Sequence, residues 1–352
     1  MSAAAPVGPS ERFLEELRRS GAYFLFPSAF KTYFASCLED GLQELGIPVA
    51  SNLGRDLLDR DDRALRDAAL VVGDVSEFEV CPQECNSVIA YVASHPGRSV
   101  VLCMSDAANS LGFPDSMVVF AAHGHARLKH GGRRIPWAFG LNREVLGKVG
   151  AARSTAPRRP VFVRNFRPSF NQSVRQVLDL AFVKNLAKTF EIDAAVDEAG
   201  RFNGAYYARL CRSLGCLAYG GEFADDVTRN AELREHGQPG RSVIGEEPVI
   251  VRWDSWRFWE SLSAGCLTVA LDFDEYGFRL PVLPENGVHY VGIRFDRLGE
   301  ALELLAGEPS RLSQIAAQGQ DWAMANYAPM PAALRFVRCV ETERSRGAPI
   351  RA

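Results

Sequence analysis

Apolar and polar residues alternate along the chain in blocks that predict a repeated order of strand, helix and strand. The run from Val249 to Asp272 shows this most clearly: two short apolar runs, Pro248 to Val251 and Cys266 to Leu271, flank a segment with helical spacing from Trp256 to Ala264. The flanking runs are too short for helices and too apolar for exposed strands, so both fit a parallel sheet covered on its two faces. Gly265 suits the left-handed position that ends the helix.

The same alternation fills the first 142 residues and suits a doubly wound domain. No GxGxxG motif opens it, so a nicotinamide-binding interpretation has no support from its motif. The pattern predicts helices at Glu11–Arg19, Phe30–Leu45 and Pro82–Ser94 and strands at Ala22–Pro27, Ile47–Ala50, Ala68–Val75, Ser99–Met104 and Met117–Ala122.

A second series begins after Gly140 to Arg159, a segment rich in Gly, Ala, Arg and Pro that is typical of a linker. The sequence therefore predicts two Rossmann-like α/β domains, residues 20–142 and 160–330, with a terminal helix and tail at 331–352 that is free to cross back. The pattern of the second series predicts strands at Val161–Arg164, Ile192–Val196, Cys216–Tyr219 and His289–Ile293 and helices at Ser173–Phe190, Gly204–Ser213, Arg297–Ala306, Pro309–Asn326 and Pro331–Glu343.

Composition and charge exclude several classes of protein. A net charge of −3 gives no sign of a nucleic-acid-binding surface. No run approaches the roughly 20 apolar residues of a membrane span. The first residues lack the hydrophobic region of a secretory signal, so we expect a cytoplasmic protein. This also argues against a two-lobed solute-binding protein. The eight cysteines lie mostly in apolar runs and are expected to be reduced core thiols, with no bound metal or other cofactor.

In the run from Val249 to Asp272, which we call the organising stretch, charged residues lie where the predicted strand passes into the predicted helix. Arg252, Arg257 and Glu260 lie at this junction, where an open α/β sheet binds ligands and where the free N–H groups of a helix favour phosphate. The sequence makes Arg257 and the Ser255 helix start candidates for binding a phosphate. Arg257 in a surface ion pair is the plainer alternative.

In the first domain, three predicted strands end at Asp74, Asp106 and His123. Neutral imidazole titrates near neutral pH, so His123 is a candidate general base, with Asp106 and Asp74 as competitors. A loop histidine without a catalytic part is the alternative, and the spacing of HGH at 123–125 is weak evidence for zinc. Five arginines around the linker form either a solvated hinge or a surface that attracts an anionic acceptor: Arg133, Arg134, Arg153, Arg158 and Arg159.

Part of the second half resembles a known family. The segments RWDSWRFWESLSAGCLTVALD, LPENGVHYVGI, FDRLGEALELL and PSRLSQIAAQGQDWAMANY are similar to the carboxyl-terminal domain of GT-B glycosyltransferases, most of all the bacterial group with an R-x-x-E-x-L-x-x-G-x-x-x-V core. IPWAFG at 135–140 is similar to the strand before the linker. The core and loop motifs match at Arg257, Glu260, Leu262, Gly265, Val269, Glu285–Gly287, Ile315, Ala316 and Gly319.

This resemblance implies two domains that face each other across a cleft, and transfer of a sugar from a nucleotide-sugar donor. The second domain would bind the donor, and the first would bind a glycan, lipid-linked, protein or small-molecule acceptor. Arg164, Arg167 and Arg257 become candidates for the diphosphate, and Glu260 for the ribose hydroxyls. The resemblance implies a metal-independent enzyme of polysaccharide biosynthesis and leaves room for peripheral membrane contact.

One position departs from the family pattern. Many retaining members carry a second Glu eight positions before the one matched by Glu260, and this chain has Arg252 there. The stereochemical outcome therefore stays open. Two rivals also stay open: a nucleotide-sugar epimerase of the same fold, and a non-catalytic module that only binds a nucleotide sugar.

Overall fold

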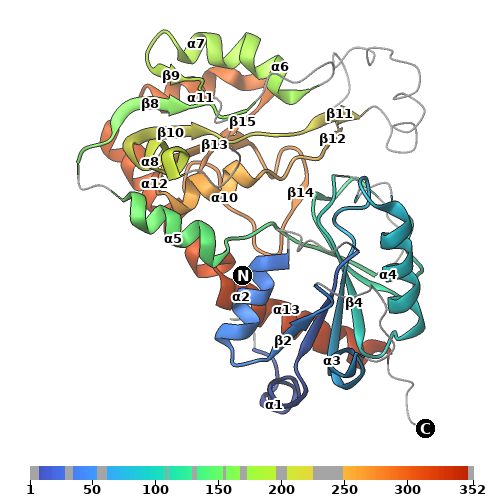
Figure 1. The fold of residues 1–352 in the computed structure, drawn as a ribbon. Helices are drawn as coiled ribbons and strands as arrows, with labels where there is room; N and C mark the ends of the chain where they lie inside the picture. The colour runs from blue at the N-terminus through green and yellow to red at the C-terminus, as the bar shows by residue number, and fades with distance from the viewer. Residues whose placement is uncertain are drawn as a thin grey trace. The chain divides into compact units, whose positions relative to one another are not determined.

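The structure is a computed structural model that describes residues 8–27, 35–53, 62–106, 108, 111–128, 133–153, 156–166, 173–195, 204–224 and 249–347. The chain divides into two compact units. Unit 1 comprises Met1–Ala122, His130–Asn142 and Tyr327–Ala352, and unit 2 comprises His123–Lys129 and Arg143–Asn326. Each unit has its own parallel sheet with helices packed against it (Figure 1). The expected pair of Rossmann-like α/β units is thus confirmed.

Unit 1 contains a six-stranded parallel sheet in the order β2-β1-β3-β4-β5-β7. Every residue of β1, β3, β4 and β5 is buried, as expected for parallel strands covered on both faces. The elements are α1 (Glu11–Ser20), β1 (Ala22–Leu25), α2 (Ser36–Glu44), β2 (Val49–Ser51), α3 (Arg63–Asp67), β3 (Leu70–Asp74), α4 (Pro82–Ser94), β4 (Ser99–Cys103), β5 (Val118–Ala121) and β7 (Arg133–Pro136).

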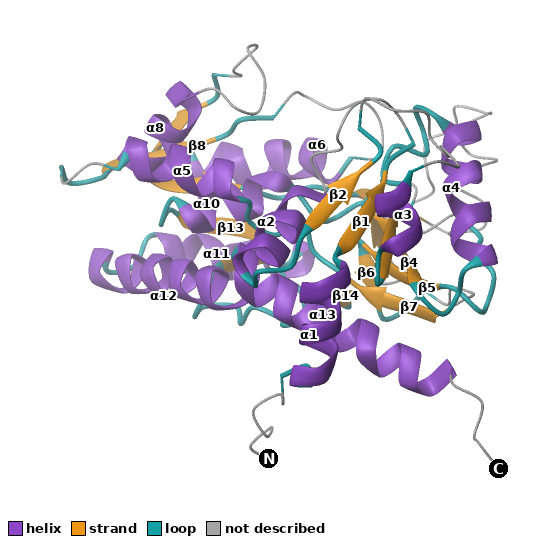
Figure 2. Cartoon of the chain, turned by 60° about the horizontal axis from the view of Figure 1, so that its bottom comes forward, coloured by secondary structure: helices purple, strands orange, loops and turns teal. Residues whose placement is uncertain are grey.

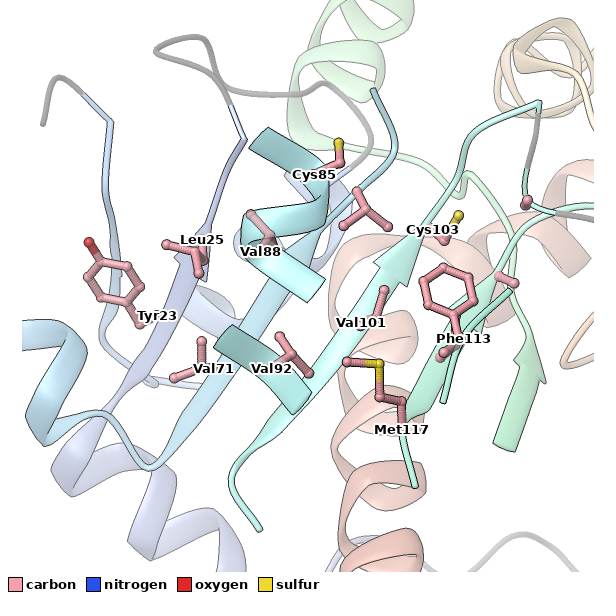
Figure 3. Close-up of a cluster of buried hydrophobic side chains, with 14 of the residues drawn as sticks. Tyr23, Leu25, Val71, Cys85, Val88, Val92, Val101, Cys103, Phe113 and Met117 are labelled. Carbon is pink, nitrogen blue, oxygen red and sulfur yellow. The ribbon is translucent and has the colours of Figure 1, made fainter. Parts of the chain in front are cut away.

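Helix α4 covers one face of this sheet. Alternate strand residues point to the same face, so Leu25, Val71 and Val101 lie together against Val88 and Val92 of α4 (Figure 3). All five side chains are almost completely buried. The alternation of apolar residues in the sequence thus becomes one contiguous core.

The opposite face is covered by α2 and by α13 (Pro329–Gly347), which lie side by side (Figure 2). Phe336 of α13 packs on Phe120 and Trp137, with ring centroids 4.6 and 6.0 Å away. A Cβ at Gly41 of α2 would lie 2.0 Å from the carbonyl oxygen of Pro329, so only glycine permits this approach. The terminal helix, which the sequence left free to cross back, thus belongs to unit 1.

Unit 2 contains a five-stranded parallel sheet in the order β15-β13-β10-β8-β9 and two short antiparallel ribbons, β11-β12 and β14-β6. Asp179–Val183 forms a π-helical turn between α6 and α7. None of the described helices is long and apolar enough to cross a membrane. The strands are β6 (Gly124–His125), β8 (Arg159–Val163), β9 (Glu191–Asp193), β10 (Ser213–Leu217), β11 (Glu222–Ala224), β12 (Val249–Val251), β13 (Leu267–Leu271), β14 (Phe278–Arg279) and β15 (Val291–Ile293). The helices are α5 (Arg143–Ala152), α6 (Val174–Leu178), α7 (Lys184–Leu186), α8 (Gly204–Arg212), α10 (Trp256–Ser263), α11 (Leu298–Leu305) and α12 (Pro309–Tyr327).

One strand of the organising stretch is placed differently from the prediction. β13 joins the parallel sheet as expected, but Val249–Val251 pairs antiparallel with β11 in a separate ribbon. β10 and β13 pair directly, so no position is left between them. Gly221, at φ +110°, lets the chain approach β12 closely, since a Cβ there would lie 2.6 Å from Ile250 Cγ2. Arg252 therefore follows an antiparallel ribbon and not a parallel strand.

Candidate anion site in unit 2

The order of strands in unit 2 defines one switch point. β9 lies on one side of β8 and β10 lies on the other, so the chain changes its direction across the sheet between β8 and β10. Open α/β sheets bind ligands beyond the carboxyl ends of the strands at such a point. Here those ends lead into Arg164 after β8 and into Tyr219 after β10.

Three arginines surround one phenyl ring beyond β8. Phe166 is fully buried, and the guanidinium carbons of Arg164, Arg175 and Arg257 lie 4.3, 5.2 and 6.0 Å from its ring centroid. Cations are attracted to the face of an aromatic ring, so Phe166 gives the three side chains a common support. We call these three arginines and Phe166 the arginine cluster.

Arg164 is held in place by Asp179, the first residue of the π-helical turn. Its Nε donates to Asp179 Oδ1 at 2.8 Å, and Nη2 donates to Oδ2. The hydrogen bond with Asp179 raises the pKa of Arg164 above its usual value. A two-point pair of this kind fixes the plane of the guanidinium.

Arg257, by contrast, has no ion-pair partner within the part of the chain that the structure describes. It lies in the first turn of α10, where its Nε donates to the backbone oxygen of Asn165. The surface ion pair considered from the sequence is therefore absent among the described residues. Asp179 compensates the charge of Arg164, and the charge of Arg257 has no ion-pair partner among the described residues.

Helix α10 begins close in sequence to this cluster, at Ser255. Ser255 is extended (φ −140°, ψ 133°) and occupies the N-cap position, yet its hydroxyl makes no capping bond. The residue is 6% exposed, and within the described residues its Oγ has no hydrogen-bond partner. The first turn of helix α10 is therefore not capped by the hydroxyl of Ser255.

The turn before α10 is fixed by side chains of the segment that follows β5. His123 Nδ1 accepts a hydrogen bond from the backbone N–H of Asp254 at 3.1 Å. Trp253 Nε1 donates to the carbonyl of Gly124 at 3.1 Å, and its ring stacks on Phe278. Trp259 Nε1 donates to Asp254 Oδ1 at 2.9 Å. Three hydrogen bonds thus fix Trp253 and Asp254, the residues before the N-cap of α10.

His123 lies in unit 2, fully buried, with a left-handed backbone at φ 57°. In a neutral imidazole one nitrogen carries the proton and the other carries the lone pair. Because Nδ1 accepts from Asp254, the lone pair is already used and Nε2 is the N–H donor. In this arrangement His123 holds a backbone N–H and does not present a base.

Glu260 is 4% exposed and is bound by two phenols. Tyr206 donates to Oε2 and Tyr207 donates to Oε1, both at 3.1 Å. Burial, and then the charge of Glu260, raise the pKa of Tyr206 well above its usual value, so this phenol stays protonated. The contact of Glu260 with ribose stays a prediction.

The other residues selected from the sequence are not among the contacts of this cluster or fall outside the described residues. Asp106 is exposed and follows β4 in unit 1, and Arg167 lies outside the described residues. Of the arginines around the linker, Arg133 pairs with Glu343 and Arg159 pairs with Glu191. Arg158 donates to the carbonyls that end α8 and α10. These three bind the protein's own groups, which leaves little of the predicted basic surface.

Sequence reasoning did not select Arg175, Asp179 and Tyr219. Arg175 and Asp179 lie in a segment predicted as helical, and Tyr219 ends a predicted strand. The sequence therefore predicted the elements that carry these residues but not that the three residues lie close together. Tyr219 and Ser255 also line one pocket that encloses about 240 Å³, open solvent included. Its other lining residues are Ala218, Gly220, Trp253, Asp254, Phe258, Ala270, Leu271, Phe273 and Phe278.

Comparison with known proteins finds similarity in solved structures only. No family model matches the chain, and no curated protein matches it. HepE from Anabaena, solved with UDP and glucose, is similar at a TM-score of 0.47 and 11% identity over 92% of this chain and 99% of that one. HepE with UDP-glucose gives 0.47 and 12%. AviGT4, a glycosyltransferase involved in avilamycin A biosynthesis, gives 0.43 and 14% over 93% and 98%.

Proposed function

We propose that the chain is a glycosyltransferase that binds a nucleotide-sugar donor on unit 2 and moves the sugar to an acceptor hydroxyl. The observation that carries this proposal is the arginine cluster at the switch point, with Arg257 lacking a carboxylate partner among the described residues. A partly buried excess of positive charge favours an anionic ligand, and a switch point is where an α/β sheet holds one.

The chemistry of the cluster suits the departure of a nucleoside diphosphate. Breaking the bond between sugar and phosphate places negative charge on the leaving group, and preorganised donors stabilise that charge. Arg164 and Arg257 would bind the phosphoryl oxygens, with the first turn of α10 at Ser255 beside them. Glu260, on the same helix as Arg257, would accept from the ribose hydroxyls, as the resemblance implies.

For the acceptor we propose Asp106 as the base. Asp106 is an exposed residue that follows β4, and His123 is a buried residue whose Nδ1 accepts from the backbone N–H of Asp254. A general base must reach the acceptor proton directly or through one water. His123 remains the second candidate from the sequence.

The proposal is tested first by thermal shift against UDP, GDP, CDP, CMP and dTDP and the corresponding nucleotide sugars. UDP-glucose is included because HepE was solved with it. A ligand at about 100 times its Kd adds roughly 2.7 kcal/mol of stability, which raises Tm by several degrees. A folded protein that shows no shift with any nucleotide contradicts the proposal.

Arg257→Ala should weaken binding of the selected nucleotide by about ten- to a hundredfold, since a charge-assisted hydrogen bond contributes roughly 1.5–3 kcal/mol. Arg297→Ala is the matched control, because Arg297 is exposed and pairs with the neighbouring Asp296. Equal affinity in Arg257→Ala and wild type would remove the phosphate assignment. Product analysis then separates the rivals: an epimerase converts the nucleotide sugar without an acceptor, and a binding module leaves it unchanged.

A further inference from the structure

The hydroxyl of Tyr219 is a buried donor that lacks an acceptor. Tyr219 is 1% exposed, and among the described residues its Oη has no hydrogen-bond partner. Burying a polar group without a partner costs free energy, so folded proteins rarely leave one in this state. Such a group points to a partner that the protein alone does not supply.

The surroundings of Tyr219 indicate what that partner is. Its ring packs against Phe166 of the arginine cluster, with ring centroids 5.4 Å apart, and its carbonyl accepts from Arg175 at 3.5 Å. Burial raises the pKa of Tyr219 well above its usual value, so the phenol stays a donor at neutral pH. Guanidinium groups also donate only. A ligand that binds the phenol and Arg257 together needs several acceptor oxygens, which a phosphoryl group has.

We propose that the Tyr219 hydroxyl donates a hydrogen bond to a phosphoryl oxygen of the donor's diphosphate. This assignment rests on the proposed nucleotide-sugar site and adds to it a residue from the end of β10. The arginines contribute positive charge, and the hydrogen bond from the phenol orients the phosphoryl group.

The proposal predicts opposite effects of one substitution on stability and on binding. Tyr219→Phe removes a hydroxyl that the free protein leaves unpartnered, so the Tm without ligand should stay unchanged or rise. The same variant should bind UDP and inorganic pyrophosphate about ten- to a hundredfold more weakly than wild type, as expected for a lost hydrogen bond to a charged group. Calorimetric titration and thermal unfolding measure the two effects.

Tyr23→Phe provides the matched control in unit 1. Tyr23 is also 1% exposed, but its hydroxyl donates to Asp62 at 2.6 Å. Removing this phenol leaves a buried carboxylate oxygen without its donor, so the Tm should fall by several degrees while pyrophosphate affinity stays unchanged. The two substitutions are chemically identical and should give opposite patterns.

Each other outcome overturns the proposal in a recognisable way. A fall in Tm of ligand-free Tyr219→Phe, comparable to that of Tyr23→Phe, would show that the fold itself satisfies the phenol. Unchanged affinity for both anions, with wild type binding them, would remove Tyr219 from the site and leave the proposed function standing. Weaker binding of UDP alone would move the phenol from the diphosphate to the nucleoside. A wild type that binds neither anion overturns the site and this assignment together.

Discussion

The carboxyl edges of the two sheets differ in chemistry although their strands follow the same order. The order β2-β1-β3-β4-β5 in unit 1 corresponds to β9-β8-β10-β13-β15 in unit 2. In unit 1, Asn52 binds both the N–H and the carbonyl of Phe26, and Ser76 links Asp74 to Met104. These polar groups therefore satisfy one another within the fold.

In unit 2 the corresponding edge holds the arginine cluster. It also holds Tyr219 and Ser255, whose hydroxyls have no hydrogen-bond partner among the described residues. Among the described residues, polar groups at the edge of unit 1 bind one another, whereas the edge of unit 2 includes two buried hydroxyls without a hydrogen-bond partner. The comparison teaches that the fold fixes where a ligand can lie, while a few side chains decide whether one is needed.

The strongest way to break this contrast is to remove the ring that supports the cluster. Phe166 is fully buried, so Phe166→Ala should lower the free energy of unfolding by about 3–5 kcal/mol and abolish measurable nucleotide binding. Phe166→Leu keeps most of the apolar volume but loses the ring face, so it should lose less stability and about tenfold in affinity. Denaturant unfolding and calorimetric titration measure both. Wild-type nucleotide affinity in Phe166→Leu would show that the ring only fills space.

A smaller effect, confined to stability, is expected at the edge of unit 1. Asn52→Ala removes two buried hydrogen bonds to Phe26 and should lower the free energy of unfolding by about 1–3 kcal/mol, with nucleotide affinity unchanged. Asn52→Asp, which keeps only the acceptor, is the comparison variant. If either variant lowered nucleotide affinity tenfold, the edge of unit 1 would contribute to donor binding and the contrast would be wrong.

The smallest effect should come from a conservative change at His123. Asparagine tolerates a positive φ and places its Oδ1 near the position of Nδ1, so His123→Asn should keep nucleotide affinity and kcat within about threefold. Glutamine places its oxygen one atom further out, and His123→Gln should bind nucleotide about tenfold more weakly. A loss of kcat by a factor of about a hundred or more in His123→Asn, with nucleotide affinity and Tm unchanged, would restore the histidine as the base.

Local pattern in the sequence was enough to predict most elements and the two-unit fold. Helix α10 and strand β13 follow from apolar spacing and from Gly265, because these signals act over a few residues. The three-residue run Val249–Val251 has no such signal, and its partner was decided by Gly221 and by the direct pairing of β10 with β13. Short apolar runs do not specify the sheet that they join.

The candidate site was predictable residue by residue but not as an arrangement. Arg164 and Arg257 could be selected from strand ends and helix starts. Their common contact with Phe166 could not be predicted, because it joins two segments that are far apart in the sequence. For the same reason the phenols that bind Glu260 were not foreseen. An unpartnered hydroxyl such as that of Tyr219 leaves no trace in a sequence pattern, because it is defined by what its neighbours lack.

The return of α13 to the first sheet also sets the order in which the protein can be completed as it is made. The segment up to Asn142 leaves the ribosome early, but the face of its sheet at Phe120 and Trp137 stays uncovered until Phe336 has been made. At 5–20 residues per second, that exposure lasts roughly ten seconds or more. Unit 2 can therefore complete its fold before unit 1, although unit 1 contains the beginning of the chain.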